Sequence, residues 1–597
     1  MRNSTLIGTF CAALLVAMVF VSSSEAAPKD KSKPEPKPAF DWVTVVNNND
    51  VMPGAPGART FNSYNQPSVN QDGLVVFRAR SKGGDKLGQP THGIYTRDML
   101  AGGPIVRILD RTTEVPDPNN LGTTFVETPS FPRIDMKSDT IATRGNHQPV
   151  WTYTPLDSDE TRAGTTGIYT NPFRELITGA SKLGNVSDFS FFEVPEPEFP
   201  GILFEVFPGS PSVTNGNTIV FKGNYTGDRG GETGVYYRQL DNEAAGGTSP
   251  VVLIANNTDT LIPGTDTVFG STAPPSAAKE RVVFAGFDNE DAPTLGGIYL
   301  APLQSEPPLT TLVSIGQRVP GEPANETFNG LGEGGAFDGR FVGFWGAWGE
   351  ETRTVRLYCA TEGNKDRIAY CNQNLVCAGT DVTLGYEYST CDDEKDPYYN
   401  ADPDKRICYQ DKQVPDNQGF FVHDIHTGKT WTVAKSGEDF NDFLYWNFSG
   451  MTPCKGSGHS KPGAEADAEA GAEDDGEPAR WRSSAFTAVA GKGANFNAAF
   501  KARKGVLVDG VYTDPVDGIY LKRGGPSNKQ AMETVLDTTM DGQTLDPLAP
   551  ADSIITELGL ELEGLRGDWL AVSAKMGIEG GEEEDDMAGV YLTELPK

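Results

Sequence analysis

The sequence predicts an all-β fold, and three observations carry this prediction. A short Gly-(Ile/Val/Phe)-(Tyr/Phe) element recurs seven times along the 597 residues. Apolar segments with the alternation and β-branched content of strands stand before and after most copies. Nothing between the copies has the periodicity of a long amphipathic helix. The regular recurrence indicates one repetitive architecture rather than several unrelated domains.

Each repeat unit is expected to hold four strands. The recurring element marks the third strand, at residues 93–95, 167–169, 234–236, 297–299, 419–421, 518–520 and 589–591. The second strand is expected upstream, at residues 74–80, 140–145, 218–223, 281–286, 340–346, 497–503 and 569–575. A turn rich in Asn, Asp or Gly before several second strands implies a short first strand. The fourth strand is expected downstream, at residues 105–110, 174–179, 251–256, 310–316, 430–436 and 532–537.

The stretch FDWVTVVNNNDVMPG, residues 40–54, decides between a ring and a linear array of these units. The last unit has no fourth strand of its own, because the sequence stops soon after its third strand. Residues 40–54 have the form of a fourth strand with its turn, and they resemble PVVLIANNTDTLIPG at 250–264. An N-terminal strand that completes the last unit would remove a free sheet edge. We therefore predict a seven-bladed β-propeller of four-stranded antiparallel blades, closed by this strand.

The first 39 residues are expected to lie outside the propeller. Residues 1–26 have the basic start, short apolar run and small residues of a secretory signal peptide. Residues 27–39 are a linker rich in Pro and Lys. No later segment has the length and apolarity of a membrane span, so the sequence predicts a secreted, extracellular monomer with one domain over residues 40–597.

The net charge of −32 favours cations over phosphate groups and argues against nucleic-acid binding. Two acidic runs, at 464–477 and 580–587, are interpreted as solvated loops that associate with Ca²⁺ only weakly, because neither has the spacing of a dedicated calcium site. The first of them belongs to an acidic loop at about 459–480. No cofactor and no specific metal site are predicted.

Six cysteines remain after the leader, and an even number in an exported chain indicates disulfides whose pairing the spacing leaves open. Most of them fall in a Cys-rich insertion at about 359–418. A zinc site at Cys371 and Cys377 is the weaker alternative, since no CxxC pair or clustered histidine accompanies them. The cysteines expected in disulfides are Cys359, Cys371, Cys377, Cys391, Cys408 and Cys454.

Five sequons predict a glycoprotein if the host glycosylates secreted proteins. They lie at Asn185, Asn224, Asn256, Asn325 and Asn447. Trp345 and Trp348 stand beside glycines near the start of the Cys-rich insertion. They are candidates for stacking on a ligand, with packing between blades as the alternative.

Catalytic residues remain unknown at this stage, because none of the motifs GxSxG, HExxH or P-loop is present. Carboxylates near the ring axis could still form an acid/base pair of the kind that glycosidases use. Sequence spacing does not reveal such a pair.

The pattern "PSxNxxGxVxFxA, variable loop, GIY, VxxI, PG" resembles that of uncharacterised secreted tandem-repeat proteins with a propeller-like architecture. The resemblance is clearest in PSVNQDGLVVFRAR and THGIYTRD, and it is weaker in the second and fifth repeats. It implies the propeller and transfers no catalytic residue.

The function predicted from the sequence is binding of an extracellular partner through the face that carries the long loops. The partner would be a glycan, a matrix component or a protein. Two alternatives stay open, namely an extracellular polysaccharide hydrolase or lyase with axial carboxylates, and a structural component of a cell covering.

Overall fold

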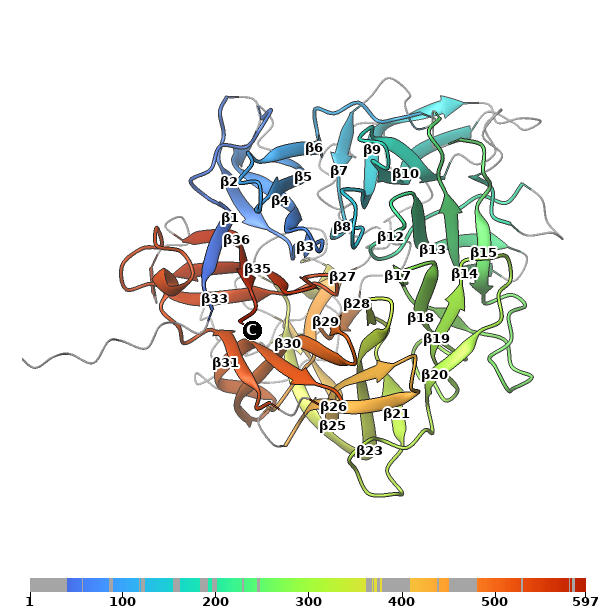
Figure 1. Cartoon of the computed structure of the whole chain (residues 1–597), viewed down its shortest axis with the longest axis vertical. Coiled ribbons are helices and arrows are strands. Elements are labelled where there is room, and N and C mark those ends of the chain that lie inside the picture. The colour runs from blue at the N-terminus through green and yellow to red at the C-terminus, as the bar shows by residue number, and fades with distance from the viewer. Residues whose placement is uncertain are drawn as a thin grey trace, which may run out of the picture. The chain divides into compact units, whose positions relative to one another are not determined.

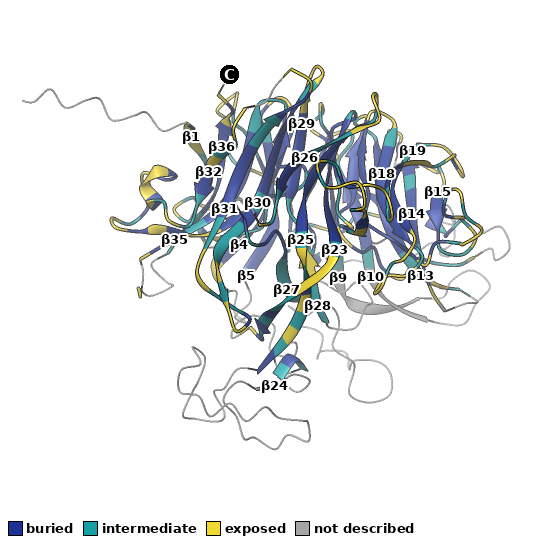
Figure 2. Cartoon of the chain, turned by 90° about the horizontal axis from the view of Figure 1, so that it is seen from below, coloured by how far each residue is buried: buried dark blue, intermediate teal, exposed yellow. Residues whose placement is uncertain are grey.

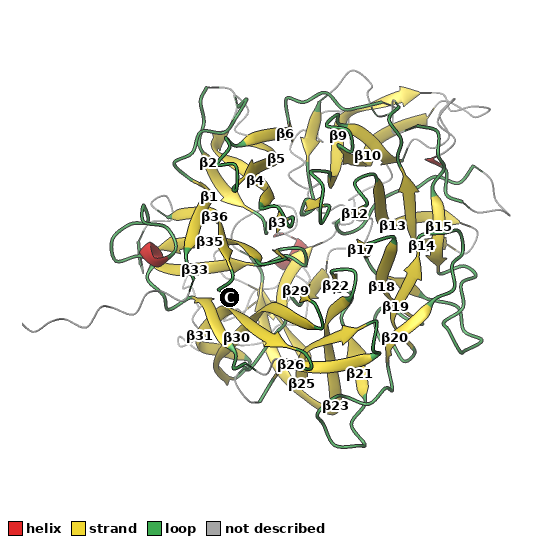
Figure 3. Ribbon diagram, in the orientation of Figure 1, coloured by secondary structure: helices red, strands yellow, loops and turns green. Residues whose placement is uncertain are grey.

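Seven antiparallel sheets of four or more strands are arranged as blades around a central axis (Figure 1). Strands form most of the regular structure (Figure 3). The predicted seven-bladed β-propeller is therefore confirmed. The structure is a computed structural model that describes residues 40–597 except 56, 85–89, 118, 120–123, 154–160, 183–191, 196–200, 228–229, 244–246, 361–367, 369, 373–375, 378–407, 438–439, 450–479, 528–529, 579, 582–585 and 597.

From the second to the fourth strand, each blade follows the predicted order outward from the axis. The second strands are β4 (Leu74–Gly84), β9 (Ile141–Tyr153), β13 (Thr218–Gly227), β18 (Arg281–Phe287), β23 (Phe341–Tyr358), β30 (Asn495–Val508) and β35 (Trp569–Gly577). The third strands are β5 (Pro90–Asp98), β10 (Thr161–Thr170), β14 (Gly230–Gln239), β19 (Gly296–Pro302), β25 (Cys408–Asp424), β31 (Val511–Gly524) and β36 (Met587–Glu594). The fourth strands are β6 (Val106–Asp110), β11 (Ile177–Ser181), β15 (Val252–Asn256), β20 (Thr310–Ser314), β26 (Lys429–Lys435), β32 (Glu533–Asp537) and, in the last blade, β1 (Trp42–Asn47).

The first strand differs from the prediction, because in five blades it is broken into two pieces that pair with the same second strand. The pairs are β2 (Phe61–Tyr64) with β3 (Ser68–Val69), β7 (Phe125–Glu127) with β8 (Arg133–Ile134), β16 (Ser271–Thr272) with β17 (Ser276–Ala278), β21 (Phe328–Leu331) with β22 (Ala336–Phe337), and β33 (Ile554–Gly559) with β34 (Leu565–Arg566). In blades 3 and 6 the inner strands are β12 (Ser212–Thr214) and β29 (Thr487–Lys492), each with an isolated bridge in place of the other piece. Other short elements include β24 (Val376–Cys377), the hairpin of β27 (Tyr445–Ser449) and β28 (Arg480–Ser484), and the 3-10 turn η6 (Gly542–Thr544).

The N-terminal strand closes the ring as predicted. β1 pairs antiparallel with β36, so that Trp42 lies opposite Thr593 and Asn47 lies opposite Gly589. Figure 1 shows the blue β1 beside the red β36. The inner strands also close a complete cycle: β3, β8, β12, β17, β22, β29 and β34 each contact the next, and β34 contacts β3. The last blade is therefore built from both ends of the described chain.

An apolar cluster of buried side chains lies between every two neighbouring blades. The cluster at the closure joins Val45 and Val46 of β1 to Phe61 and Phe77 of blade 1. Each of these four side chains is fully buried. Burial of a side chain of this kind stabilises the fold by about 1.5–3 kcal/mol, so the closing strand contributes substantially to the ring.

The recurring Gly-Ile-Tyr element builds the centre of each blade. In six blades its aromatic residue meets a phenylalanine at or near the start of the first strand, as in Phe125 with Tyr169 at 4.6 Å between ring centroids and Phe269 with Tyr299 at 5.3 Å. Glycine in the second strand makes room for this contact. A Cβ at Gly145 would lie 2.7 Å from a carbon of the Phe125 ring, so a larger residue there would displace the ring.

Candidate functional site

The two faces of the propeller differ in their connections. The first and second strands are joined by tight turns on one face, whereas the second-to-third strand connections and the links between blades lie on the other. This second face is called the long-loop face below. Figure 2 shows β24, β27 and β28 projecting from one side of the ring, while the C-terminus lies on the opposite side. Function is commonly carried by the variable loops of a rigid scaffold.

Two hairpin arms from blades 5 and 6 extend this face. In blade 5, residues 352–358 of β23 form a ladder with residues 409–415 of β25, so the last part of the predicted insertion is strand. In blade 6, β30 and β31 continue to a tight turn after Val508. The arms touch, because the amide of Arg356 donates to the carbonyl of Gly510 at 2.7 Å.

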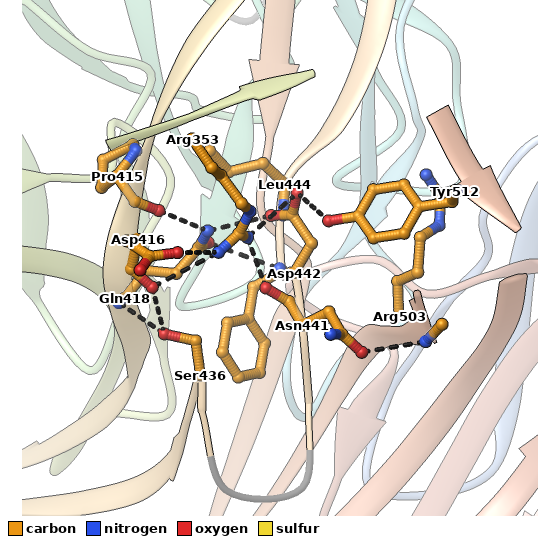
Figure 4. Close-up of polar contacts among 12 residues, drawn as sticks. Arg353, Pro415, Asp416, Gln418, Ser436, Asn441, Asp442, Leu444, Arg503 and Tyr512 are labelled. Atoms are coloured by element: carbon orange, nitrogen blue, oxygen red, sulfur yellow. Dashed lines mark hydrogen bonds and ion pairs between the residues drawn. The ribbon is translucent and has the colours of Figure 1, made fainter. Parts of the chain in front are cut away.

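A buried polar network holds the two arms together, with Asp442 at its centre (Figure 4). One oxygen of Asp442 accepts from Gln418 Nε2 at 3.0 Å, and the other accepts from the Tyr512 hydroxyl at 3.0 Å. The guanidinium of Arg353 lies 3.4 Å from Asp442 and 3.0 Å from Asp416. Burial lowers the pKa of Arg353, but Asp442 and Tyr512 raise it by more than burial lowers it. The pKa therefore lies above its ordinary value, and the guanidinium stays charged. Burial raises the pKa of Tyr512, which keeps its hydroxyl a donor.

The hairpin of β27 and β28 packs on the base of the Cys-rich insertion. Cys359 and Cys371 form a disulfide, and Phe448 and Trp481 of the hairpin pack against it. The rings of Phe448 and Trp481 lie 5.4 Å apart. At the start of β28, Arg480 lies 2.6 Å from a carboxylate oxygen of Glu290 in the second-to-third strand loop of blade 4. Loops of blades 4, 5 and 6 thus form one connected group, called the loop layer below.

Cation–π contacts join the other end of the hairpin to blade 6. The ammonium of Lys501 lies 3.8 Å from the centroid of the Tyr445 ring, and the Arg503 guanidinium lies 5.2 Å from it. Burial lowers the pKa of Lys501 to about 8; Arg503 lowers it as well, while Asp517 and Glu557 oppose the shift. Among the described side chains, none forms an ion pair or a hydrogen bond with the Lys501 ammonium, whose contact with the Tyr445 ring is a cation–π contact.

Charged side chains also meet near the ring axis. Arg133 of β8 lies 2.9 Å from Glu561, and Arg566 of β34 lies 3.5 Å from Glu563. The Ser212 hydroxyl donates to Glu563 at 3.1 Å. Glu561 and Glu563 are only 3% and 1% exposed. Both carboxylates are therefore buried. An ion pair ties blade 7 to blade 2, and a hydrogen bond ties it to blade 3.

A second buried ionic group lies between blades 1 and 2. Glu127 of β7 forms an ion pair with Arg78 and lies 2.9 Å from Nδ1 of His92. Burial raises the pKa of Glu127, but Arg78 and His92 more than offset this, so the pKa lies well below its ordinary value. Burial lowers the pKa of His92. This group was not predicted from the sequence, although a charged residue inside the apolar segment LVVFRAR was a signal for it.

Trp345 and Trp348 are not ligand platforms, so this candidate role is corrected. They are 8% and 4% exposed, and they pack in the clusters on the two sides of blade 5. The Nε1 atom of Trp345 donates to Gln418 at 3.1 Å, and Trp348 contacts the ring of Phe421. Both belong to the regular part of β23, where alternate residues face the neighbouring blades.

The cysteines are only partly described. Besides the Cys359–Cys371 bond, Cys408 is disulfide-bonded, and Cys377 lies opposite it in β24. Cys391 and Cys454 lie outside the described residues, as does the acidic run 464–477. The acidic run 580–587 is described only in part.

The sequons lie in different environments. Asn325 and Asn447 are exposed, Asn224 is half-buried in β13, and Asn185 lies outside the described residues. Asn256 is fully buried, and its side-chain oxygen accepts from the amide and hydroxyl of Thr260. Attachment of a glycan to Asn256 would require this fully buried side chain to become exposed. Glycosylation at the exposed sites stays a prediction.

Within the described part of the chain, no three His, Cys, Asp or Glu side chains are grouped so as to hold a metal ion. The helices found there include none that is long and apolar enough to cross a membrane.

Comparison with known proteins finds no matching family model and no matching curated protein. Among solved structures, the chain is similar to a member of the GH130 family of mannoside phosphorylases. That family contains glycoside hydrolases that target β-1,2-mannosidic linkages in Candida mannan. The match has 12% identity and a TM-score of 0.21, and it covers 52% of this chain and 92% of that one. A glycosyl hydrolase from Bacteroides ovatus matches with 12% identity and a TM-score of 0.21 over 53% of this chain and 89% of that one. The tricorn protease matches with 10% identity and a TM-score of 0.18 over 87% of this chain and 36% of that one. Likenesses at these TM-scores carry no argument about function.

Proposed function

We propose that this protein is a secreted β-propeller that binds an extracellular partner, a glycan or a protein, through its long-loop face. The observation that carries the proposal is the loop layer. A disulfide closes the base of the blade-5 insertion, Phe448 and Trp481 pack against it, and the ion pairs of Arg480 reach the loop of blade 4. The ring itself does not need these contacts, because apolar clusters already join its blades. Loops held on a rigid scaffold commonly carry function.

The buried state of Glu561 and Glu563 favours binding over hydrolysis at the axis. An acid/base pair for glycoside hydrolysis needs two carboxyl groups that reach the substrate, about 5–10 Å apart. The axial carboxylates are instead held by Arg133 and Arg566. A disulfide in the loop layer also agrees with an oxidising, extracellular location.

Replacement of Trp481 by alanine tests this proposal. The ring of Trp481 contacts the Cys359–Cys371 region, so its loss should loosen the loop layer while leaving the blades folded. The full-length protein, the Trp481→Ala variant and a Δ360–407 variant would be applied to immobilised β-glucan, mannan, chitin and collagen. We expect the protein to bind at least one of these and both variants to lose at least tenfold in affinity for it.

Trp569→Ala is the matched control, because Trp569 is equally half-buried but packs beside Gly73, in a tight turn of the opposite face. Its binding should equal that of the unchanged protein. The proposal would be overturned if Trp481→Ala and Δ360–407 bound as tightly as the unchanged protein, or if none of the proteins bound any of the polymers.

A further inference from the structure

A cavity of about 400 Å³ lies on the long-loop face at the seam between blades 7 and 1. Asn48, directly after the closing strand, forms part of its wall. Residues 62–64 and Gln66 of blade 1 form another part. Residues 557–559 of β33 and 573–575 of β35, with Asp586 and Ala588, form the rest. Its volume falls in the range of about 300–1,000 Å³ that small-molecule sites occupy.

Two buried polar atoms of this wall lack a protein partner. The side-chain oxygen of Asn48 and the hydroxyl of Tyr64 are both buried, and neither forms a hydrogen bond with any described residue. The amide nitrogen of Asn48 donates to the carbonyl of Asp586 at 3.1 Å, which fixes the orientation of that side chain. Because both atoms belong to side chains that line the cavity, they are available to form hydrogen bonds with a polar guest.

Further hydrogen-bonding side chains line the cavity without a partner in the described part of the chain. They are the amides of Asn62 and Gln66, the hydroxyl of Ser573 and the carboxylate of Glu557. Amides donate and accept, a hydroxyl does both, and a carboxylate accepts. A ligand that offers several donors and acceptors close together would satisfy this set.

The charge of the wall narrows the class of ligand. Lys575 lies 3.0 Å from Asp586, so its positive charge is already neutralised. Glu557 is exposed and remains as an unpaired carboxylate. A wall with no free cation disfavours phosphate and carboxylate ligands, and a lining of amides and hydroxyls disfavours an apolar one.

We propose that the seam cavity binds a neutral sugar unit of a glycan, through hydrogen bonds from Asn48, Asn62, Tyr64 and Gln66. The inference rests on the proposed function in placing the ligand on the long-loop face, and it adds a second, separate contact to the loop layer. The hydroxyl groups of a pyranose ring both donate and accept, and so they match the unpartnered groups of this wall.

Saturation-transfer NMR with cellobiose, laminaribiose, mannobiose and N,N′-diacetylchitobiose tests the proposal on the full-length protein. The decisive variant is Asn62→Ala/Gln66→Ala, which removes two amides at partly or fully exposed positions and leaves the apolar clusters untouched. We expect at least one of the disaccharides to bind, and the double variant to weaken that binding about tenfold, as the loss of two hydrogen bonds implies.

Gln304→Ala is the control, since Gln304 is exposed in the third-to-fourth strand connection of blade 4, on the opposite face. It should bind like the unchanged protein. The proposal is overturned if none of the four disaccharides binds, if the double variant binds as tightly as the control, or if galacturonic acid or inorganic phosphate binds more tightly than the neutral sugars.

The outcomes also separate this inference from the proposed function. If Trp481→Ala loses binding to an immobilised polymer while Asn62→Ala/Gln66→Ala keeps both polymer and disaccharide binding, the cavity is not the sugar site and the loop-layer proposal stands. If the double variant loses disaccharide binding while Trp481→Ala binds every polymer like the unchanged protein, the cavity is the sugar site and the loop-layer proposal fails.

Discussion

The junction between blades 5 and 6 and the seam between blades 7 and 1 differ in what surrounds their polar side chains. At the first, both oxygens of Asp442 accept hydrogen bonds from neighbouring groups of the protein. Within that network, Nε of Arg353 is a buried atom without a partner. At the second, the oxygen of Asn48 and the hydroxyl of Tyr64 are buried and unpartnered, and they stand beside a cavity.

This difference separates structure from recognition. A polar network whose members satisfy one another rigidifies the fold and has little capacity left for a ligand. Polar groups without partners, gathered around an open space, have that capacity. The arms of blades 5 and 6 are therefore expected to respond to substitution mainly in stability, and the seam cavity mainly in binding.

Removal of residues 40–54 should have the largest effect, because it deletes the closing strand and one wall of the seam cavity together. Val45 and Val46 are fully buried, and each contributes about 1.5–3 kcal/mol by burial alone. The loss of pairing with β36 adds to this. Hydrogen exchange followed by mass spectrometry should show lost protection in β35 and β36, near Trp569 and Tyr591.

The strands of blade 4, far from the seam, supply the internal control for this deletion. Residues 281–287 should keep their protection. If β35 and β36 kept theirs as well, the closed ring would not depend on β1, and the account of the seam would fail.

Asp442→Ala should come next, with a loss of about 3–5 kcal/mol in the free energy of unfolding. The change removes one of the two carboxylates beside the half-buried Arg353, which keeps Asp416, and it leaves the Gln418 amide and the Tyr512 hydroxyl without their acceptor. Asp442→Asn keeps the shape and some hydrogen bonds and should cost less. Chemical denaturation measures both. Disaccharide binding at the seam should be unchanged, and a loss of it at temperatures where the variant is folded would contradict the division between the two regions.

Much of the fold was accessible from the sequence because the blade core repeats. The tyrosine of the recurring element, the nearby phenylalanine and the strand glycines have to meet in the same way in each blade, as Phe125, Gly145 and Tyr169 do. The closing strand was visible because residues 40–54 carry the pattern of a fourth strand. Local periodicity and repetition therefore fixed the blades and their closure.

The candidate sites were not accessible, because they depend on contacts between blades far apart in sequence. Asn48 and Glu557 meet at one cavity only after the ring closes. Trp345 was misread because glycine on both sides of an aromatic pair is typical of loops, whereas here β23 continues through it as a long regular strand. The break in the first strand, which brings Glu561 and Glu563 to the axis, leaves no periodic signal either.

Tyr64→Phe sharpens the comparison with a smaller effect. The hydroxyl is buried without a partner, so its removal should leave the free energy of unfolding unchanged or raise it by up to about 1 kcal/mol. Disaccharide binding at the seam should weaken. Tyr512→Phe is the matched variant at the other junction, where the hydroxyl donates to Asp442, and it should lower stability by about 1–2 kcal/mol. Equal stability effects of the two changes would break the comparison.

Lys501 offers a test that depends on pH. Its pKa is about 8 in the folded protein and 10.5 ordinarily. Between these values the unfolded chain holds a proton that the folded chain has released, so the free energy of unfolding should rise as the pH rises from 8 toward 10. Lys501→Met should remove this rise, as denaturation midpoints at several pH values would show. An identical pH profile for the variant would mean that the ammonium is not desolvated beside Tyr445.

A crystal structure of the full-length protein with a bound neutral disaccharide tests the central claim most directly. The account predicts the sugar in the seam cavity, with hydroxyl groups within hydrogen-bond distance of Asn48, Tyr64 and Gln66, and an unchanged network around Asp442. A sugar bound at the junction of blades 5 and 6, or bound elsewhere with the seam cavity holding only water, would contradict it.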